Sequence, residues 1–437
     1  MTQATLTPGF TKEAFDAFLS ARNEPDWLID RRRSAWKLFC EQDLPGRSDE
    51  EWMRTDIRLF KLDSFGIPGE LQGAIEVPTP LLTAGVDLGG QGTSFNGQTV
   101  EYSVGQKWAD QGVLFGDLAQ LAVEHSELLR PYLMKRAFDS AADKFSALHG
   151  ACWSNGTLLY VPSGVAVDEP FHTLSALANG GVDLGHLLVI LEEGSEATLL
   201  TETANTGSVA GGFHCGATEI IVGPKAHLRY VSLQNWDQRV WHFSREKVAV
   251  DGDASLQWTM GALGSRLAKV NQHVELTGAG AQVQVNGTMF TEGRQHLSYH
   301  TRQHHVAPNC RSDFLYKAAL QDKSRTVWRG MIKVDLEAQK TDGYQRNDNL
   351  LLSSQARADA IPGLEIEADD VRCTHGSTTS RVDDEMIFYA QSRGFIREEA
   401  IRMIVTGFFQ QIFDRISIES VRESLGMAIA RRVREYE

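Results

Sequence analysis

The sequence lacks a long apolar run. The segment "LLVIL" at residues 187–191 is among the longest, whereas a membrane-spanning helix needs about 20 apolar residues. The first residues, "MTQATLTPGFTKEAFDAF", contain no basic segment followed by an apolar one, the pattern that a secretory signal requires. We therefore expect a cytoplasmic protein with no membrane segment.

Cysteines are few and scattered. The chain has 437 residues and five cysteines, Cys40, Cys152, Cys215, Cys310 and Cys373. No pair has the spacing C-x-x-C, which argues against a disulfide framework and against a zinc ribbon. Each cysteine alone is most simply interpreted as a small buried apolar residue.

Positive charge and catalytic motifs are also scarce. The chain has 43 Lys and Arg residues against 57 Asp and Glu residues, a net charge of −14. We therefore expect neither nucleic acid nor an anionic membrane as a partner. The sequence contains no G-x-x-x-x-G-K-[ST], H-E-x-x-H or G-x-S-x-G motif, so we expect no bound nucleotide and no self-contained active site. These absences favour a scaffold or assembly subunit.

From about residue 155 the sequence contains a repeating strand pattern. Four segments each have a strand, a turn G-x-x-A (with Asp for Gly once) and a second strand, and the turns end at Ala197, Ala226, Ala254 and Ala281. These alanines lie 29, 28 and 27 residues apart. Two strands in each repeat of about 28 residues indicate a solenoid of stacked β-coils. In it, Gly supplies a positive φ and Ala faces the interior. A meandering β-sandwich with chance spacing is the alternative.

Helical patterns flank this β-rich part. We predict an N-terminal helical region with loops and short strands over residues 1–150, a β-solenoid core over 151–382 and a C-terminal helical region over 383–437. Near the N-terminus, "WLIDRRRSAWKLF" after Pro25 predicts one helix, and a capping box formed by Ser48 and Glu51 predicts another.

The C-terminal helical region carries a broad apolar stripe. Apolar residues recur there at helical spacing over about four turns. Two interpretations remain open: the stripe packs on the solenoid, whose end must be capped, or it is a docking face for another subunit.

A histidine-rich segment, "HLSYHTRQHHVAPNC", contains His296, His300, His304, His305 and Cys310. In an extended strand His296, His300 and His304 share one face, but neighbours four residues apart lie about 13 Å apart. They can bind one metal ion only with help from adjacent coils. Solvated or hydrogen-bonded imidazoles are the simpler interpretation.

The acidic segment "EADDVRCTHGSTTSRVDDE", from Glu367 to Glu385, contains a second candidate metal site. Cys373 and His375 are two residues apart, so they share a face if the strand continues through them. A thiolate and an imidazole suit Fe, Zn or the edge of a cluster. They make only half of a tetrahedral site, so other residues or another chain must complete it. The alternative is a buried cysteine beside a hydrogen-bonded histidine.

Several segments resemble one known family. The extended stretch "EADDVRCTHGSTTSRVDDEMIFYAQSRGF" resembles the C-terminal signature of the SufB/SufD family of iron–sulfur cluster assembly proteins, and "HHVAPNCRSDFLYKAALQDKSRTVWRGMIKV" and "AQKTDGYQRNDNLLLS" are similar to two more of its segments. Within the family the chain resembles the SufD branch. SufB members carry a cysteine where this chain has Ala390, and His375 lies at the position of the SufD histidine.

The resemblance implies a right-handed parallel β-helix between helical ends and a non-catalytic scaffold subunit that supports cluster assembly and iron acquisition. It implies a SufB partner that shares a transient Fe–S cluster, with His375 as a ligand and Cys373 as a second candidate. It also implies that the SufC ATPase docks on the C-terminal helices, where the candidate residues are Phe408, Phe409, Ile412 and Phe413. The sequence does not decide whether a flavin binds.

Two other functions remain as alternatives. Parallel β-helices often carry carbohydrate-cleaving sites built from carboxylates, and this chain has the pairs Asp369/Asp370 and Asp383/Asp384. A scaffold that works alone as a SufB-like homodimer is the other alternative, and Ala390 argues against it.

Overall fold

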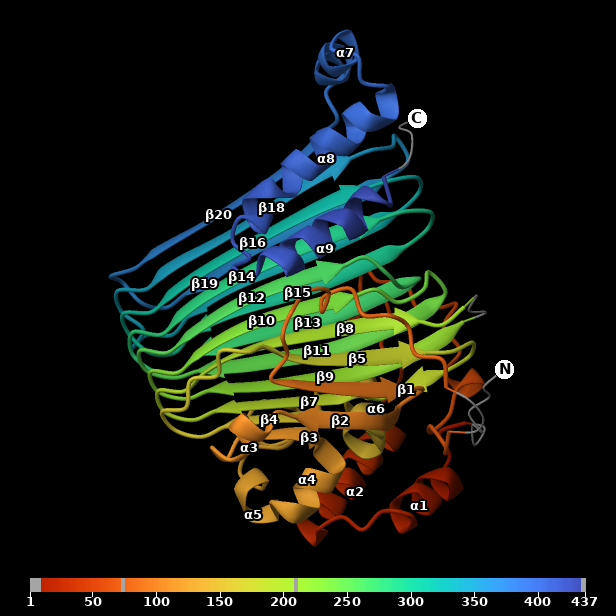
Figure 1. Cartoon of the computed structure of the whole chain (residues 1–437), viewed down its shortest axis with the longest axis vertical. Helices are drawn as coiled ribbons and strands as arrows, with labels where there is room; N and C mark the ends of the chain where they lie inside the picture. The colour runs from red at the N-terminus through yellow and green to blue at the C-terminus, as the bar shows by residue number, and fades with distance from the viewer. Residues whose placement is uncertain (1–8, 72–74, 208–210, 434–437) are drawn as a thin grey trace.

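The computed structural model describes residues 9–71, 75–207 and 211–433, and its centre is a β-solenoid of about eight turns (Figure 1). One long sheet, here the β20 sheet, contains in spatial order β2 (Gln98–Val104), β1 (Gly90–Phe95), β5 (Phe171–Leu177), β8 (Glu196–Asn205), β10 (His227–Gln234), β12 (Ser255–Ala262), β14 (Gln282–Thr291), β16 (Arg311–Leu320), β18 (Asp342–Leu351) and β20 (Arg372–Arg381). The other, the β19 sheet, contains β19 (Arg357–Ile366), β17 (Arg325–Val334), β15 (His296–His305), β13 (Leu267–Leu276), β11 (Val240–Val250), β9 (Gly212–Val222), β7 (His186–Leu191), β4 (Gly156–Val161) and β3 (Leu114–Asp117), with β6 (Val182–Asp183) beside β9.

Each coil of the solenoid contributes one strand to each sheet. A strand pairs in parallel with the strand two positions further along the chain: β12 with β14, β14 with β16, and β13 with β15. This parallel ladder confirms the predicted β-solenoid and excludes the meandering sandwich. The ladder continues with full-length strands to β20, beyond the four repeats that the sequence pattern identifies.

The turns of the repeat differ in one detail from the prediction. All four repeat alanines are buried, as expected. Gly194 has a positive φ (66°), but in the next three turns the positive φ falls on the residue before the alanine, Lys225, Asp253 and Gly280. Gly278 is required for another reason: a Cβ there would lie 1.9 Å from the Gly252 nitrogen, because successive turns stack closely.

The N-terminal region covers the first coils. Its helices are α1 (Lys12–Ser20), α2 (Asp26–Glu41), α3 (Gln106–Ala109), α4 (Leu118–Glu124), α5 (Ser126–Leu129) and α6 (Lys144–Cys152), with a 3-10 turn at Leu62–Ser64. The helix predicted after Pro25 is α2. The helix predicted from the Ser48–Glu51 capping box is wrong: this segment forms turns, and there the Asp49 carboxylate accepts the Gly46 N–H at 2.7 Å. Aromatic side chains of this region pack on the outer face of the β19 sheet through Phe213 and Phe243.

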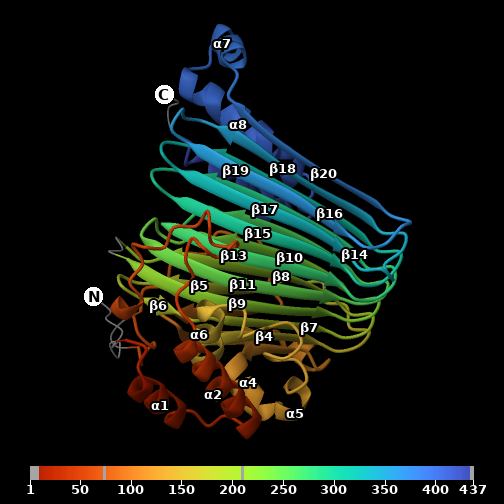
Figure 2. The ribbon, with the colours of Figure 1, turned by 180° about the vertical axis from the view of Figure 1, so that it is seen from behind.

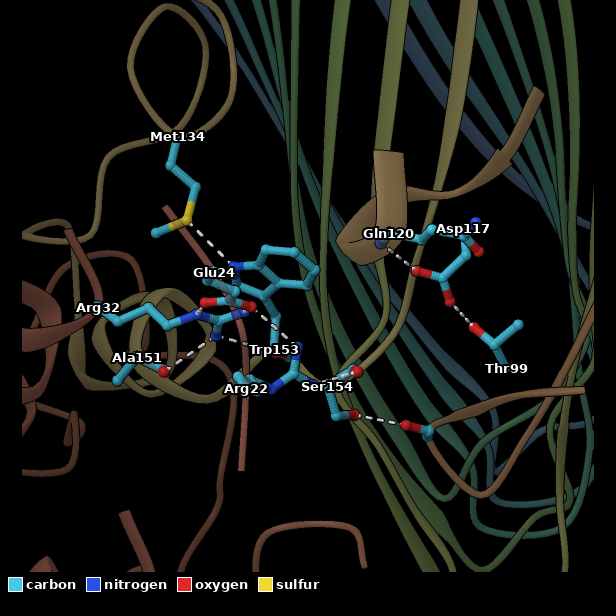
Figure 3. Close-up of polar contacts among 11 residues, drawn as sticks. Arg22, Glu24, Arg32, Thr99, Asp117, Gln120, Met134, Ala151, Trp153 and Ser154 are labelled. Atoms are coloured by element: carbon cyan, nitrogen blue, oxygen red, sulfur yellow. Dashed lines mark hydrogen bonds and ion pairs between the residues drawn. The ribbon is translucent and has the colours of Figure 1, made fainter. Parts of the chain in front are cut away.

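A buried ion pair fastens α2 to the start of the solenoid (Figure 3). Arg32 is fully buried and donates to both carboxylate oxygens of Glu24, at 2.7 and 2.8 Å. It also donates to the carbonyls of Ala151 and Trp153, at 3.2 and 3.0 Å, and lies 4.1 Å from the centre of the Trp153 ring. The bonds to Ala151 and Trp153 join α2 to the segment that leads into β4 and hold the helix against the first coil, and the Glu24 carboxylate neutralises the buried guanidinium.

Three helices follow the solenoid: α7 (Asp384–Ser392), α8 (Arg397–Phe413) and α9 (Glu419–Ala430). α8 and α9 lie along the outer face of the β20 sheet, and α7 projects beyond it (Figure 1). Seen from behind, no helix of the described chain crosses β15, β17 or β19 (Figure 2). Among the described helices none is long and apolar enough to cross a membrane.

Candidate functional site at the open end of the solenoid

The last coil of the solenoid has a neighbour on one side only. β20 pairs with β18 and β19 pairs with β17, and neither has a further strand partner in the part of the chain that the structure describes. Leu364 and Ile366 on β19 are 38% and 40% exposed, whereas their partners one coil earlier, Ile332 and Val334, are fully buried. We call residues 357–381 the open end.

The two edges of the open end differ in their free backbone groups. The Arg372 N–H donates to the Thr341 carbonyl and so points toward β18. Along a parallel strand, the backbone N–H and C=O groups of successive residues point alternately toward one neighbouring strand and toward the other. Cys373 and His375 therefore direct their N–H and C=O groups outward. On β19 the same alternation places Pro362 at an outward position, where its missing N–H breaks no bond within the chain. The outer edge of β20 therefore offers an unbroken row of backbone N–H donors, whereas the row on β19 is interrupted at Pro362.

The structure places the predicted ligands Cys373 and His375 on β20, at the open end. Cys373 is half-buried and packs with Ile332, Ala338 and Ala368. Burial raises the pKa of this thiol, which disfavours the thiolate that would bind a metal. His375 is exposed. In the chain alone, the His375 imidazole is accessible from solvent, whereas Cys373 is a packed thiol beside it.

The interior of the solenoid becomes polar toward the open end. Gln345, Asn347 and Asn349 are buried beneath β20. Gln345 donates to the Gly363 carbonyl at 3.0 Å, and Asn349 donates to the Thr378 carbonyl at 3.2 Å. Buried amides can take water as a hydrogen-bond partner in place of a protein group. Contact with solvent at the open end therefore costs this polar interior less than it would cost an apolar one.

The predicted SufC-docking residues do not form an exposed face. Phe409, Ile412 and Phe413 are at most 3% exposed, and Phe408 is half-buried. Phe409 and Phe413 belong to the cluster between α8 and the β20 sheet that contains Phe290 and Ala319. Most of the stripe therefore packs on the solenoid, the first of the two interpretations above.

Sequence reasoning missed the exposed apolar residues nearby. Large apolar side chains of α7, the α7–α8 turn and α8 that are 41–73% exposed are Met386, Phe388, Tyr389, Phe395, Ile396 and Met403. We call these six residues the α7–α8 apolar surface. The signal was present in "EMIFYAQSRGF", but a helix of nine residues is too short for periodicity alone to separate its exposed face from its buried one.

The other residues that the sequence singled out are not brought together with Cys373 and His375 in one cluster. His305 and Cys310 point into the protein, where His305 Nε2 lies 2.8 Å from Ser312 Oγ and the Cys310 thiol donates to the Gly278 carbonyl. Asp369/Asp370 and Asp383/Asp384 are exposed beside the ends of β20, and Asp383 accepts the Glu385 N–H at 2.8 Å as the N-cap of α7. The Asp383 carboxylate therefore already has a structural role.

A polar cavity of about 120 Å³ lies inside the early coils. Its lining includes Asp183 of β6, His214 of β9, and His242 and Glu246 of β11. Because these three strands belong to different coils, no single sequence motif contains all four residues. His242 Nδ1 is 2.8 Å from His214 Nδ1, and His214 Nε2 is 3.7 Å from Asp183 Oδ2. Burial raises the pKa of both Asp183 and Glu246 to about 7.

Comparisons with known proteins cover nearly the whole chain. Residues 16–172 match the SufBD protein N-terminal region, and residues 173–408 match the SufBD core domain of SUF system FeS cluster assembly. Proteins named iron-sulfur cluster assembly SufBD family protein from Staphylococcus epidermidis, Staphylococcus haemolyticus and Staphylococcus aureus are each 26% identical over 421 residues, which is 94% of this chain and 90% of theirs.

Proposed function

Because this chain belongs to the SufBD family of the SUF iron–sulfur cluster assembly system, we propose that it is a SufD-type scaffold subunit that pairs with SufB through its open end. The observation that carries the proposal is the unpartnered last coil. Two strand edges, the exposed Leu364 and Ile366 and a polar interior lie together there. An uncovered strand edge is a template for pairing with another chain.

The nascent cluster, which is the cargo of this system, would meet this subunit at His375. This imidazole lies on the face of β20 that continues the solenoid interior, so a partner stacked on the last coil would lie directly against it. One imidazole does not complete a tetrahedral site. The remaining ligands would come from SufB, with Cys373 as the nearest additional donor once its packing opens. The chain itself carries out no catalysis in this proposal.

The SufC ATPase would dock on the α7–α8 apolar surface. Phe388 and Tyr389 are 73% and 61% exposed, on a helix that projects from the body of the protein. Large exposed apolar side chains gathered on neighbouring helices are typical of interaction sites. This assignment replaces Phe409, Ile412 and Phe413 as the primary contacts, since all three are buried, and Phe409 and Phe413 pack between α8 and the β20 sheet.

The proposal is tested by co-purifying the chain with SufB and SufC and measuring iron and acid-labile sulfide under anaerobic conditions. His375→Ala should assemble the complex normally and lose cluster. His227→Ala, which removes another exposed histidine from the β20 sheet far from the open end, should keep the cluster. If His375→Ala retains full iron and sulfide, the ligands are not on this strand. If the wild-type chain forms no complex with SufB and SufC, or a homodimer alone carries the cluster, the SufD-type assignment fails.

A further inference from the structure

The histidines of strand β15 are too far apart to bind one metal ion by themselves, but residues of β13, one coil earlier, lie beside one of them. His304 lies directly beside Glu275 of β13 in the parallel register, and His273 lies two residues before Glu275 on the same outer face. One nitrogen of each imidazole and one carboxylate oxygen all lie within 4.8 Å of one another. We propose that His273, Glu275 and His304 form a binding site for a divalent first-row transition-metal ion.

The three donor atoms lie close together. His273 Nε2 lies 3.5 Å from Glu275 Oε1, and His304 Nδ1 lies 3.8 Å from the same oxygen. The two imidazole rings are 5.9 Å apart and inclined by 22°. His273 Nε2 is shielded from solvent and has no hydrogen-bond partner among the residues that the structure describes. This nitrogen, beside a carboxylate and a second imidazole, is free to bind a metal ion.

The tautomer of His304 is fixed by a fourth residue. His304 Nε2 lies 2.9 and 3.0 Å from the two carboxylate oxygens of Asp335, so Nε2 carries the proton and donates it there. The lone pair of Nδ1 then faces Glu275 and His273. Metal-binding histidines characteristically donate their other N–H to a carboxylate in this way, which orients the ring and strengthens the ligand. Asp335 is therefore a positioning residue of the site.

The ligand set indicates which ion would bind. Two imidazoles and one carboxylate suit Zn(II), Fe(II) and related ions, and three protein ligands leave a position for water or a transferred group. The side chains are 17–27% exposed, so an ion can reach them from solvent. In the metal-free chain the Lys247 ammonium lies 3.0 Å from Glu275 Oε1. A bound ion would take the place of that ammonium on the oxygen.

The site is independent of the cluster ligands at the open end. His273, Glu275 and His304 lie on the outer face of the β19 sheet, whereas Cys373 and His375 lie on the last strand of the β20 sheet. Loss of one site should therefore leave the other intact, and the two proposals can fail separately.

The test uses the untagged, metal-free full-length chain titrated with Co(II), followed by its visible absorption, with Zn(II) as competitor. We expect one Co(II) bound per chain at this site, with an affinity that falls at least about 100-fold in His273→Ala and in His304→Ala. Asp335→Asn should cost about 10- to 100-fold, as for other groups that orient a ligand. Lys247→Met should raise the affinity, since it removes the competing cation.

Two controls keep the outcome decisive. His300→Ala removes a histidine of the same strand and face that lies outside the cluster, and His375→Ala removes the ligand at the open end; both should bind Co(II) at this site as the wild type does. Glu275→Gln preserves the side-chain shape and should also lose binding if an alanine variant fails to fold. The proposal fails if the wild type binds no Co(II), or if the His273, His304 and Glu275 variants bind it as the wild type does. These residues would then only form hydrogen bonds and ion pairs between neighbouring strands.

Discussion

The two ends of the solenoid are finished in different ways. At the N-terminal end, β3 pairs antiparallel with β4 and β2 pairs antiparallel with β1, and Trp108, Phe115 and Phe171 fill the first coil. Thr99 of β2 donates to the Asp117 carboxylate that caps α4, which closes this end (Figure 3). At the C-terminal end nothing comparable covers β19 and β20 in the described chain. Terminal coils of a solenoid need a cap, so on our proposal SufB supplies the cap that the described residues do not provide at this end.

The largest difference between the two ends should be in the free energy of unfolding lost when a large apolar side chain is replaced by alanine. Phe171→Ala at the closed end removes a fully buried ring and should lower the free energy of unfolding by about 3–5 kcal/mol. Ile366→Ala at the open end, where the side chain is 40% exposed, should cost only about 1 kcal/mol in the isolated chain. Urea unfolding followed by circular dichroism measures both. Equal losses would show that the open end is as tightly packed as the closed one.

Charging the α7–α8 apolar surface should weaken binding without unfolding the chain. Phe388→Asp should weaken SufC binding at least about 30-fold, equivalent to about 2 kcal/mol at an interface hot spot, with an unchanged Tm. Leu59→Asp, a change at a 71% exposed residue of the N-terminal region, is the matched control. Phe409→Asp should instead lower the Tm, because it buries a carboxylate against the β20 sheet. Calorimetric titration and thermal unfolding distinguish these results, and normal SufC binding by Phe388→Asp would place the docking face elsewhere.

The two ends should also respond to pH with opposite signs. Burial raises the pKa of Asp183 in the early coils to about 7, above its value in the unfolded chain. The folded state then holds the extra proton, so the free energy of unfolding falls as the pH rises from about 4 to 7, by at most about 1.4 kcal/mol per unit. Asp183→Asn should remove this fall.

At the open end, a hydrogen bond from Arg372 lowers the pKa of Asp342, so its contribution is lost as the pH falls. The Asp342 side chain is 33% exposed and that of its partner Arg372 is 76% exposed, so solvent screens the pair. Asp342→Asn should therefore have the smallest effect of these changes, confined to acid pH. Urea midpoints measured from pH 4 to 8 test both carboxylates. An Asp183→Asn profile that parallels the wild type would show that Asp183 titrates normally.

The fold was predictable because its signal is periodic. Ala197, Ala226, Ala254 and Ala281 recur once per coil, and each lies inside the solenoid. The Ser48–Glu51 helix failed because a capping box describes only a local preference, and this segment instead forms turns held by Asp49. The family resemblance pointed to the solenoid's last strand through Cys373 and His375, although the sequence did not show that this strand is an uncovered edge.

Contacts between coils were out of reach of sequence analysis. His304 meets Glu275 across 29 positions, and Asp183 meets His214 across 31, because neighbours in the solenoid are one coil apart in the chain. Only the strand register brings such residues together. The exposed face of α7 was missed because the apolar stripe of α8 is the longer signal, although it belongs to the core.

Hydrogen–deuterium exchange of this chain, alone and mixed with SufB, tests most directly whether the open end is an interface. In the isolated chain the outward amides of β20, those of Cys373, His375 and alternate residues after them, should exchange rapidly. On addition of SufB, peptides covering residues 357–381 should become protected, while those covering β2 at the closed end should not change. Protection elsewhere, or none at the open end in a complex that has formed, would contradict the account.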